Sequence, residues 1–243
     1  MKVDAVILAG GTLKGSKQEK AFIKIGEQTL LEKCVQTLKE CPSIEQLIVA
    51  SAPESAKASP SVDELLHDTG DLLQNIVNAL EKVKSEKALL VACDIPFITS
   101  QHIDEYLNSC SKVKADIYYP LVPKSSMGEF SAMKRTYFKL DRTEFTGGNI
   151  ILVTKSIFLA NIDLARKIYD NRKSPLKLAQ IVGLYFLVKL ALGKLTVSEA
   201  EQKTTKIIGG LVKGIIIPRP EIGSDIDKEE DLQFFKTLYG ADR

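Results

Sequence analysis

A pair of glycines followed by several lysines is the first stretch of the sequence with the composition of a ligand-binding loop. Gly10 and Gly11 follow the apolar residues 5–8, with only Ala9 in between. Three lysines follow within ten residues, Lys14, Lys17 and Lys20. Glycine lets the backbone adopt positive φ and lets a ligand approach the main chain closely, and backbone N–H groups gathered near lysines favour polyphosphate. A surface turn with solvated lysines explains the same stretch, so it leaves both interpretations open.

Aspartates at two distant places are the candidate metal ligands. Asp94 closely follows the apolar residues 88–92, where a carboxylate can bind a hard cation such as Mg²⁺ or accept turn hydrogen bonds. Asp225 and Asp227 are the second source. Because Asp227 directly precedes a predicted helix, it suits the N-cap, and Asp225 is the better candidate ligand. Two such aspartates could hold one Mg²⁺ against nucleotide phosphates and stabilise charge on a pyrophosphate leaving group.

Lys20 is the lysine best placed to contact phosphate. It lies where the loop returns to the apolar residues 21–23, whose packing would fix the stem and aim the ammonium. Lys14 and Lys17 either assist it or are solvated. The loop is neither a Walker A motif nor GxGxxG, which disfavours NAD binding.

The only two histidines, His67 and His102, are expected at the surface or in a helix cap. Without a strong base, the suitable reaction is one in which an already ionised phosphate oxygen attacks an α-phosphorus.

Alternating strands and helices would bring the loop and Asp94 together. In the first half, strands are predicted at 5–8, 47–50 and 88–92, helices at 30–38, 72–83 and 99–111, and a loop at 51–61. Thr29 and Glu32 form a capping-box pattern before the first helix. This alternation predicts an α/β fold with a largely parallel sheet covered on both faces. Ligands bind beyond the carboxyl ends of such strands, where the glycine loop and Asp94 both lie.

The second half is less regular and carries a helical insertion. Further strands are predicted at 117–120, 135–140, 150–153 and 212–217, with helices at 156–170 and 228–239. We expect a single domain over 1–243 with the insertion at about 170–210. Its residues 176–192 are strongly apolar but too short and interrupted to span a membrane. They predict a buried or homodimer-forming helix, or alternatively a surface for an apolar substrate or a membrane face.

Composition and charge limit the kinds of partner and location to be expected for this protein. A formal net charge of +2 with 26% charged residues gives no electrostatic basis for nucleic-acid binding. Four cysteines without a CxxC pair predict reduced structural residues. Because no leader-like segment is present, we expect a cytoplasmic protein.

Four motifs, in this order, resemble those of the MobA-like nucleotidyltransferases, whose fold is shared with the sugar-phosphate and methylerythritol-phosphate nucleotidyltransferases. They are Leu8-Ala9-Gly10-Gly11 with Lys20-Ala21-Phe22-Ile23, Asp94-Ile95-Pro96-Phe97, Thr146-Gly147-Gly148-Asn149, and Asp225-Ile226-Asp227. The resemblance implies a three-layer α/β/α, Rossmann-like fold of the nucleotide-diphospho-sugar transferase type with a mostly parallel mixed sheet.

The resemblance also implies roles for individual residues. The implied nucleotide-binding residues are Leu8, Ala9, Gly10, Gly11, Thr12, Lys20, Gly70 and Asn75. Those implied in catalysis are Lys20, Asp94 and Asp225, with Asp94 and Asp225 as Mg²⁺ ligands and Asp227 as the alternative. Those implied on the acceptor side are Gly147, Gly148 and Asn149.

The sequence departs from the family pattern at two places. The arginine of the usual glycine loop is missing, and Lys14 or Lys17 is the candidate replacement. The insertion at 174–210 lies outside the simpler molybdopterin guanylyltransferase pattern, so that substrate is not transferred.

We therefore expect an Mg²⁺-dependent nucleotidyltransferase that joins NMP from an NTP to a phosphorylated small-molecule acceptor and releases pyrophosphate. A nucleotide-sugar-dependent glycosyltransferase and a non-catalytic nucleotide-binding protein are the alternatives. The nucleotide base and the acceptor stay open.

Overall fold

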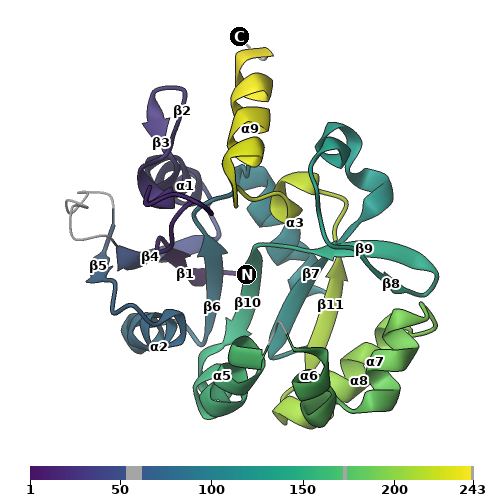
Figure 1. Cartoon of the computed structure of the whole chain (residues 1–243). Helices are drawn as coiled ribbons and strands as arrows, with labels where there is room; N and C mark the ends of the chain where they lie inside the picture. The colour runs from purple at the N-terminus through teal and green to yellow at the C-terminus, as the bar shows by residue number, and fades with distance from the viewer. Residues whose placement is uncertain (53–61, 172–173, 242–243) are drawn as a thin grey trace.

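A mixed β-sheet forms the centre of the molecule (Figure 1). The computed structural model describes residues 1–52, 62–171 and 174–241, and these contain a nine-stranded sheet of order β5-β4-β1-β6-β10-β7-β9-β8, with β11 paired to β7. The strands are β1 Val3–Leu8, β4 Ile44–Ala52, β5 Glu64–His67, β6 Lys87–Ala92, β7 Ile117–Pro123, β8 Phe138–Leu140, β9 Thr143–Gly147, β10 Ile150–Thr154 and β11 Val212–Ile216. A separate small hairpin joins β2 Lys24–Ile25 and β3 Gln28–Thr29.

Most strands of the sheet run in one direction. β1 is parallel to both β4 and β6, β5 is parallel to β4, and β11 is parallel to β7. β10 is antiparallel to β6 and β7, and β9 is antiparallel to β7 and β8. The predicted mostly parallel mixed sheet is therefore confirmed. The carboxyl ends of β1 and β6 meet at one edge, because Leu8 pairs with Ala92.

Helices cover both faces of the sheet and make the three-layer fold. One face carries α1 Leu30–Lys39, α3 Ser100–Ser111 and α9 Glu229–Ala241; the other carries α2 Leu72–Lys82 and α5 Ile162–Asn171 (Figure 1). Helix α4 Lys155–Ala160 lies on the same face as α2, because its Phe158 packs against the core cluster that contains Ile76. Alternate residues of β1 serve the two faces. Ile7 belongs to the core cluster with Leu30 and Phe235, whereas Val6 belongs to the cluster with Ile76.

The starts of the first helices follow local sequence signals. Thr29 and Glu32 form the predicted capping box of α1, in which the Thr29 N–H donates to Glu32 Oε2 at 2.7 Å and the Glu32 N–H donates to Thr29 Oγ1 at 3.2 Å. Asp71 is the N-cap of α2 and accepts from the Gln74 N–H at 2.9 Å. His102 completes a capping box with Thr99 at the start of α3, as expected for a capping histidine.

Several predicted bounds were wrong. Only 138–140 of the predicted strand 135–140 is β8, because Arg135 lies in the preceding loop and binds Asp225 instead of joining the sheet. The predicted helix 156–170 is divided into α4 and α5 at Asn161. Strands β5 and β9 were not predicted. Of the predicted loop 51–61, residues 51 and 52 belong to β4 and 53–61 lie outside the described residues.

The insertion differs most from its prediction. It contains α6 Pro175–Val182, α7 Leu184–Ala191 and α8 Val197–Ile208, and Gly183 with φ of 92° separates the first two. Phe186 packs against the cluster that contains Leu195, but Leu176 is 80% exposed and Tyr185 is 79% exposed. A single buried helix over 176–192 was therefore wrong. Among the described residues, no helix has both the length and the apolar character needed to cross a membrane.

We predict that Thr29→Ala lowers the free energy of unfolding by about 1 kcal/mol, because α1 loses its side-chain cap. Thr136→Ala is the matched control, since Thr136 is exposed in a loop and should change stability by less than about 0.5 kcal/mol. Urea denaturation of both variants measures the difference. Equal losses in the two variants would contradict the assigned cap.

Candidate functional site

The glycine loop leaves β1 at its carboxyl end and folds back on itself. The Ala9 N–H donates to the carbonyl of Ala50 at 2.9 Å, and the Lys20 N–H donates to the carbonyl of Gly11 at 3.1 Å. Gly11 has φ of 94°, and a Cβ added there would meet no atom within 4 Å. The loop therefore needs glycine at this position for its conformation, and the space beside its backbone is open to a ligand.

The three predicted aspartates converge beside this loop. Asp94, Asp225 and Asp227 each offer one carboxylate oxygen, and these oxygens lie within 4.8 Å of one another. We call these three residues the acid cluster. The Ile226 N–H donates to the carbonyl of Asp94 at 2.9 Å, which fixes the C-terminal segment against the end of β6. The Lys14 N–H donates to the carbonyl of Asp227 at 2.9 Å and ties the same segment to the glycine loop.

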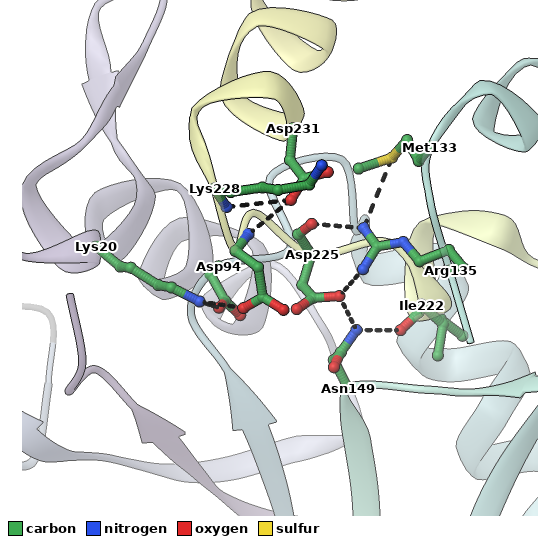
Figure 2. A network of polar contacts seen from close by, with 10 residues as sticks. Lys20, Asp94, Met133, Arg135, Asn149, Ile222, Asp225, Lys228 and Asp231 are labelled. Carbon is green, nitrogen blue, oxygen red and sulfur yellow. Dashed lines mark hydrogen bonds and ion pairs between the residues drawn. The ribbon is translucent and has the colours of Figure 1, made fainter. Parts of the chain in front are cut away.

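Lys20 bridges two members of the acid cluster. Its Nζ lies 2.7 Å from Asp94 Oδ2 and 2.7 Å from Asp227 Oδ1, and Figure 2 shows the side chain reaching toward Asp94. The Lys20 side chain is only 12% exposed. The predicted fixed stem and directed ammonium are present, although in this structure the ammonium is directed at carboxylates.

Asp225 is held from the opposite side by Arg135 and Asn149 (Figure 2). The Arg135 guanidinium forms an ion pair with the Asp225 carboxylate, and its Nη2 donates to the Asp225 carbonyl at 2.5 Å. Asn149 Nδ2 donates to Asp225 Oδ1 at 3.3 Å and to the carbonyl of Ile222 at 3.3 Å. Arg135 is the site residue that sequence reasoning missed, since no local pattern distinguishes it from a solvated arginine.

The protonation of these groups reflects burial and mutual charge. Burial opposes the charge on Lys20, but the carboxylates of Asp94 and Asp227 outweigh it and raise the Lys20 pKa above its usual value. Burial and the nearby Asp94 charge raise the pKa of Asp225, against the effect of Arg135. Burial also acts on Asp227, but Lys20 outweighs it and lowers the Asp227 pKa. With three carboxylates against two cations, the site at neutral pH has a net charge of about −1, which favours a further cation.

The donor set fits a hard divalent cation. Asp94 Oδ1 is buried and has no hydrogen-bond partner among the described residues, so the site contains an unsatisfied anionic oxygen. Carboxylate oxygens are the ligands that Mg²⁺ takes in proteins. The proposed capping role of Asp227 was wrong: α9 begins at Glu229, and the carboxylate that accepts the N–H groups of Asp227 and Lys228, both at 3.1 Å, is that of Asp231. Asp227, which pairs with Lys20, lies beside Asp94 and Asp225 as the alternative ligand, and the metal roles of all three stay predictions.

The remaining predicted residues lie around this centre with other contacts. The buried Asn75 accepts from the Thr69 N–H at 2.9 Å and donates to Asp68 Oδ1 at 2.6 Å, so its side chain holds the loop that contains Gly70. Its nucleoside role stays a prediction, as does that of Gly70. Thr12 is exposed and forms a β-bridge with Glu19.

Gly147 and Gly148 let two chain segments approach closely. A Cβ added at Gly148 would lie 2.6 Å from side-chain atoms of both Ile222 and Pro120, and one at Gly147 would lie 2.0 Å from Tyr119 Oη. Packing therefore accounts for both glycines, and their acceptor role stays a prediction.

The other lysines of the loop and the cysteines make no further contribution to the acid cluster. Lys14 and Lys17 are exposed, and neither forms an ion pair within the described part of the chain. Whether one of them replaces the arginine of the family loop stays a prediction. The four cysteines are free and buried.

We predict that Lys20→Met lowers the free energy of unfolding by about 3 kcal/mol at pH 7, because it leaves buried carboxylates unpaired. The lowered Asp227 pKa gives stability that is present above the ordinary value of 3.8 and lost as pH falls through the folded value. The raised Lys20 pKa gives stability that is complete below 10.5 and lost as pH rises through the folded value. Urea denaturation from pH 3 to pH 9, with Lys17→Met as control, should show that the loss of unfolding free energy in Lys20→Met becomes smaller only at the acidic end. A loss that does not vary with pH would contradict the ion pairs of Lys20 with the carboxylates.

Comparison with known proteins agrees with this geometry. Residues 5–154 match the family model described as "MobA-like NTP transferase domain". A "probable molybdenum cofactor guanylyltransferase" of Clostridium perfringens strain 13 is 32% identical over 126 residues, which cover 51% of this chain and 60% of the relative. The Haemophilus influenzae Rd "molybdenum cofactor guanylyltransferase" is 31% identical over 122 residues, which cover 48% and 62%. The chain thus spans about 60% of the length of these curated relatives.

Solved structures extend the likeness over the whole chain. A hypothetical transferase of Thermus thermophilus is 34% identical with a TM-score of 0.84, covering 96% of this chain and 100% of the other. The 2-C-methyl-D-erythritol 4-phosphate cytidylyltransferase of the same species is 16% identical with a TM-score of 0.61, covering 99% and 100%, and shows the shared fold alone. Because the family match covers more than half of the 243 residues, this chain belongs to the MobA-like NTP transferase family.

Proposed function

We propose that this protein is an Mg²⁺-dependent nucleotidyltransferase that joins NMP from an NTP to a phosphorylated acceptor and releases pyrophosphate. The observation that carries the proposal is the convergence of the acid cluster and Lys20 beside the open backbone of Gly11. Membership of the MobA-like family supports it, as do the relatives named guanylyltransferases. The free buried cysteines are consistent with a cytoplasmic location.

Lys20 and the glycine loop would bind the triphosphate. The open space beside Gly11 would admit phosphate oxygens to the backbone, and the Lys20 ammonium, which bonds Asp94 and Asp227 in this structure, would donate to phosphate oxygens. Asp94 and Asp225, together with Asp227, would hold Mg²⁺, whose charge would orient the phosphates and stabilise the leaving pyrophosphate. Lys20, whose ammonium bridges Asp94 and Asp227, would neutralise phosphate charge in the occupied site. The resting ion pairs would thus keep the charged site assembled until substrate arrives.

The acceptor phosphate supplies its own nucleophile. One of its ionised oxygens forms a bond to the α-phosphorus, and the bond from that phosphorus to the bridging oxygen breaks as pyrophosphate leaves. No protein base is needed, which suits the role of His102 in the α3 capping box rather than in the acid cluster. Arg135 and Asn149 act as positioning residues, because they hold the Asp225 carboxylate toward Asp94.

We predict that Mg²⁺ with GTP stabilises the protein and that Asp94→Asn abolishes this effect. GTP is tested first because the curated relatives are guanylyltransferases; ATP, CTP and UTP follow. At a hundredfold excess over Kd, ligand binding adds about 2.7 kcal/mol, or about 5–10 °C in melting temperature. Asp94→Asn keeps the side-chain shape but removes the charge, so we expect it to fold and to lose the Mg²⁺-dependent shift. Asp163→Asn, at an exposed position of α5, is the matched control.

Product analysis separates nucleotidyl transfer from its alternatives. Pyrophosphate formed from NTP supports the proposal. Release of NDP from a nucleotide sugar, with no pyrophosphate from any NTP, would instead favour a glycosyltransferase. Tight NTP binding without turnover across a broad panel of phosphorylated acceptors would favour a non-catalytic nucleotide-binding protein.

A further inference from the structure

A large apolar cavity lies on the sheet face that α2 and α5 cover. Its volume is about 690 Å³, within the range of small-molecule sites. The floor is made by strands β6, β7 and β10, through Leu90, Ile117 and Ile151. The walls are helices α2, α5 and α8, through Ile76, Ile168 and Ala200. These helices lie below the sheet in the view of Figure 1.

Two polar side chains along the wall, Glu201 and Thr204, are bonded within the protein. The Glu201 carboxylate accepts from Lys213 Nζ at 2.6 Å and from the Gly214 N–H at 2.9 Å. The Thr204 hydroxyl donates to the carbonyl of Ala200 at 2.8 Å. The surface that this cavity offers to a ligand consists mostly of carbon atoms. Such a surface selects hydrocarbon and disfavours a sugar or a pterin, whose polar atoms would lose their water without replacement.

One end of the cavity reaches the candidate active site. Asn149 lines it, and this same side chain donates to Asp225 Oδ1 at 3.3 Å. Asn149 immediately precedes β10, and Ile151 is the second residue of that strand; both line the cavity, in keeping with the two-residue periodicity of a strand. Ala92, which also lines the cavity, lies two residues before Asp94. A molecule with its phosphate at the acid cluster can therefore extend its remainder along the sheet face.

Much of the cavity wall is built outside the segment that defines the family. The family match ends at residue 154, whereas α5 and α8 follow it in the sequence. The glycine loop and Asp94 lie inside the matched segment. The glycine loop and Asp94 thus lie in the segment shared with the family, and much of the apolar wall lies after it.

We propose that the acceptor is a phosphate monoester of a long hydrocarbon chain, with its phosphate at the acid cluster and its chain in this cavity. The inference rests on the nucleotidyl transfer proposed above. A cavity of about 150 Å³ holds benzene, so this one holds on the order of twenty carbons. A chain-phosphate oxygen would bond to the NTP α-phosphorus as pyrophosphate leaves with the electron pair of the broken bond. The product would be a nucleoside diphosphate esterified to the chain, and no oxidant or further reactant is required.

Two synthetic acceptors of different hydrocarbon length test directly whether the protein recognises a long hydrocarbon chain. Dodecyl phosphate and butyl phosphate share the reacting group and differ by eight methylenes, each of which favours burial by about 0.8 kcal/mol. With Mg²⁺ and the NTP that stabilises the protein, we expect kcat/KM for pyrophosphate release to be about 100-fold or more higher for dodecyl phosphate. Mass spectrometry should detect the product, a nucleoside diphosphate esterified to the dodecyl chain. Equal rates for the two acceptors would overturn the proposal.

Filling the cavity supplies the second test. Ala200→Phe projects a ring from α8 into the cavity, and Ala165→Phe does so from α5 if the first variant fails to fold. Ala191→Phe, at an exposed position of α7, adds the same ring elsewhere. We expect the cavity variants to lose the preference for dodecyl over butyl phosphate while keeping the Mg²⁺–NTP thermal shift, and the α7 variant to keep both. If the cavity variants kept the full preference for dodecyl over butyl phosphate, the hydrocarbon chain would bind outside this cavity and the inference would be refuted.

The two proposals fail differently. Absence of any Mg²⁺–NTP thermal shift and of any pyrophosphate release would refute nucleotidyl transfer itself. A normal nucleotide shift together with turnover of short polar phosphates but not of dodecyl phosphate would leave nucleotidyl transfer standing and refute the hydrocarbon acceptor. Calorimetric binding of dodecyl phosphate that Ala200→Phe does not weaken would also refute it.

Discussion

Electrostatic repulsion within the acid cluster is the constraint on which the site depends. Each pair of carboxylates lies within 4.8 Å, and at an effective dielectric constant of about 20 such a pair costs roughly 3 kcal/mol or more. Lys20 and Arg135 offset this cost from opposite sides, and both are largely buried. The two cations therefore keep the carboxylates assembled. In the proposed function, substrate would have to replace these ion pairs, so the binding of the cation and the binding of the triphosphate would depend on each other.

This arrangement needs both ends of the chain. The glycine loop and Asp94 follow neighbouring parallel strands, so the sheet alone brings them to one edge. Asp225 and Asp227 arrive from the last part of the chain, and backbone hydrogen bonds from Ile226 to Asp94 and from Lys14 to Asp227 fix them there. These bonds involve main-chain atoms and do not depend on the side-chain charges. The charged centre is thus built on a backbone frame that a charge-neutralising substitution should leave in place.

The sequence predicted the mostly parallel sheet and named four of the five charged residues that meet in the candidate site, whereas Arg135 is placed by a distant contact that no local pattern shows. Short apolar runs indicated β1, β4 and β6, and parallel strand order then placed the glycine loop near Asp94. Arg135 contacts Asp225 across ninety positions of sequence, and nothing near Arg135 marks it as a partner. The apolar residues 176–192 indicated burial, yet Gly183 breaks them into two helices with exposed apolar side chains. The hydrophobicity of this segment indicated burial, but it did not predict where the helices end or which apolar side chains stay exposed.

The insertion and the active site are connected through the sheet rather than through loops. Asn149 and Ile151 lie on one face of the sheet, so Asn149 can contact Asp225 at the beginning of β10 while Ile151 lines the apolar cavity further along. A helix that follows residue 154 in the chain can therefore change what lies against the sheet without altering the acid cluster or the glycine loop. In the proposed function, this separation would let the nucleotide chemistry stay fixed while the acceptor changes, because the groups that hold charge lie at the edge of the sheet and the groups that select shape lie along its face.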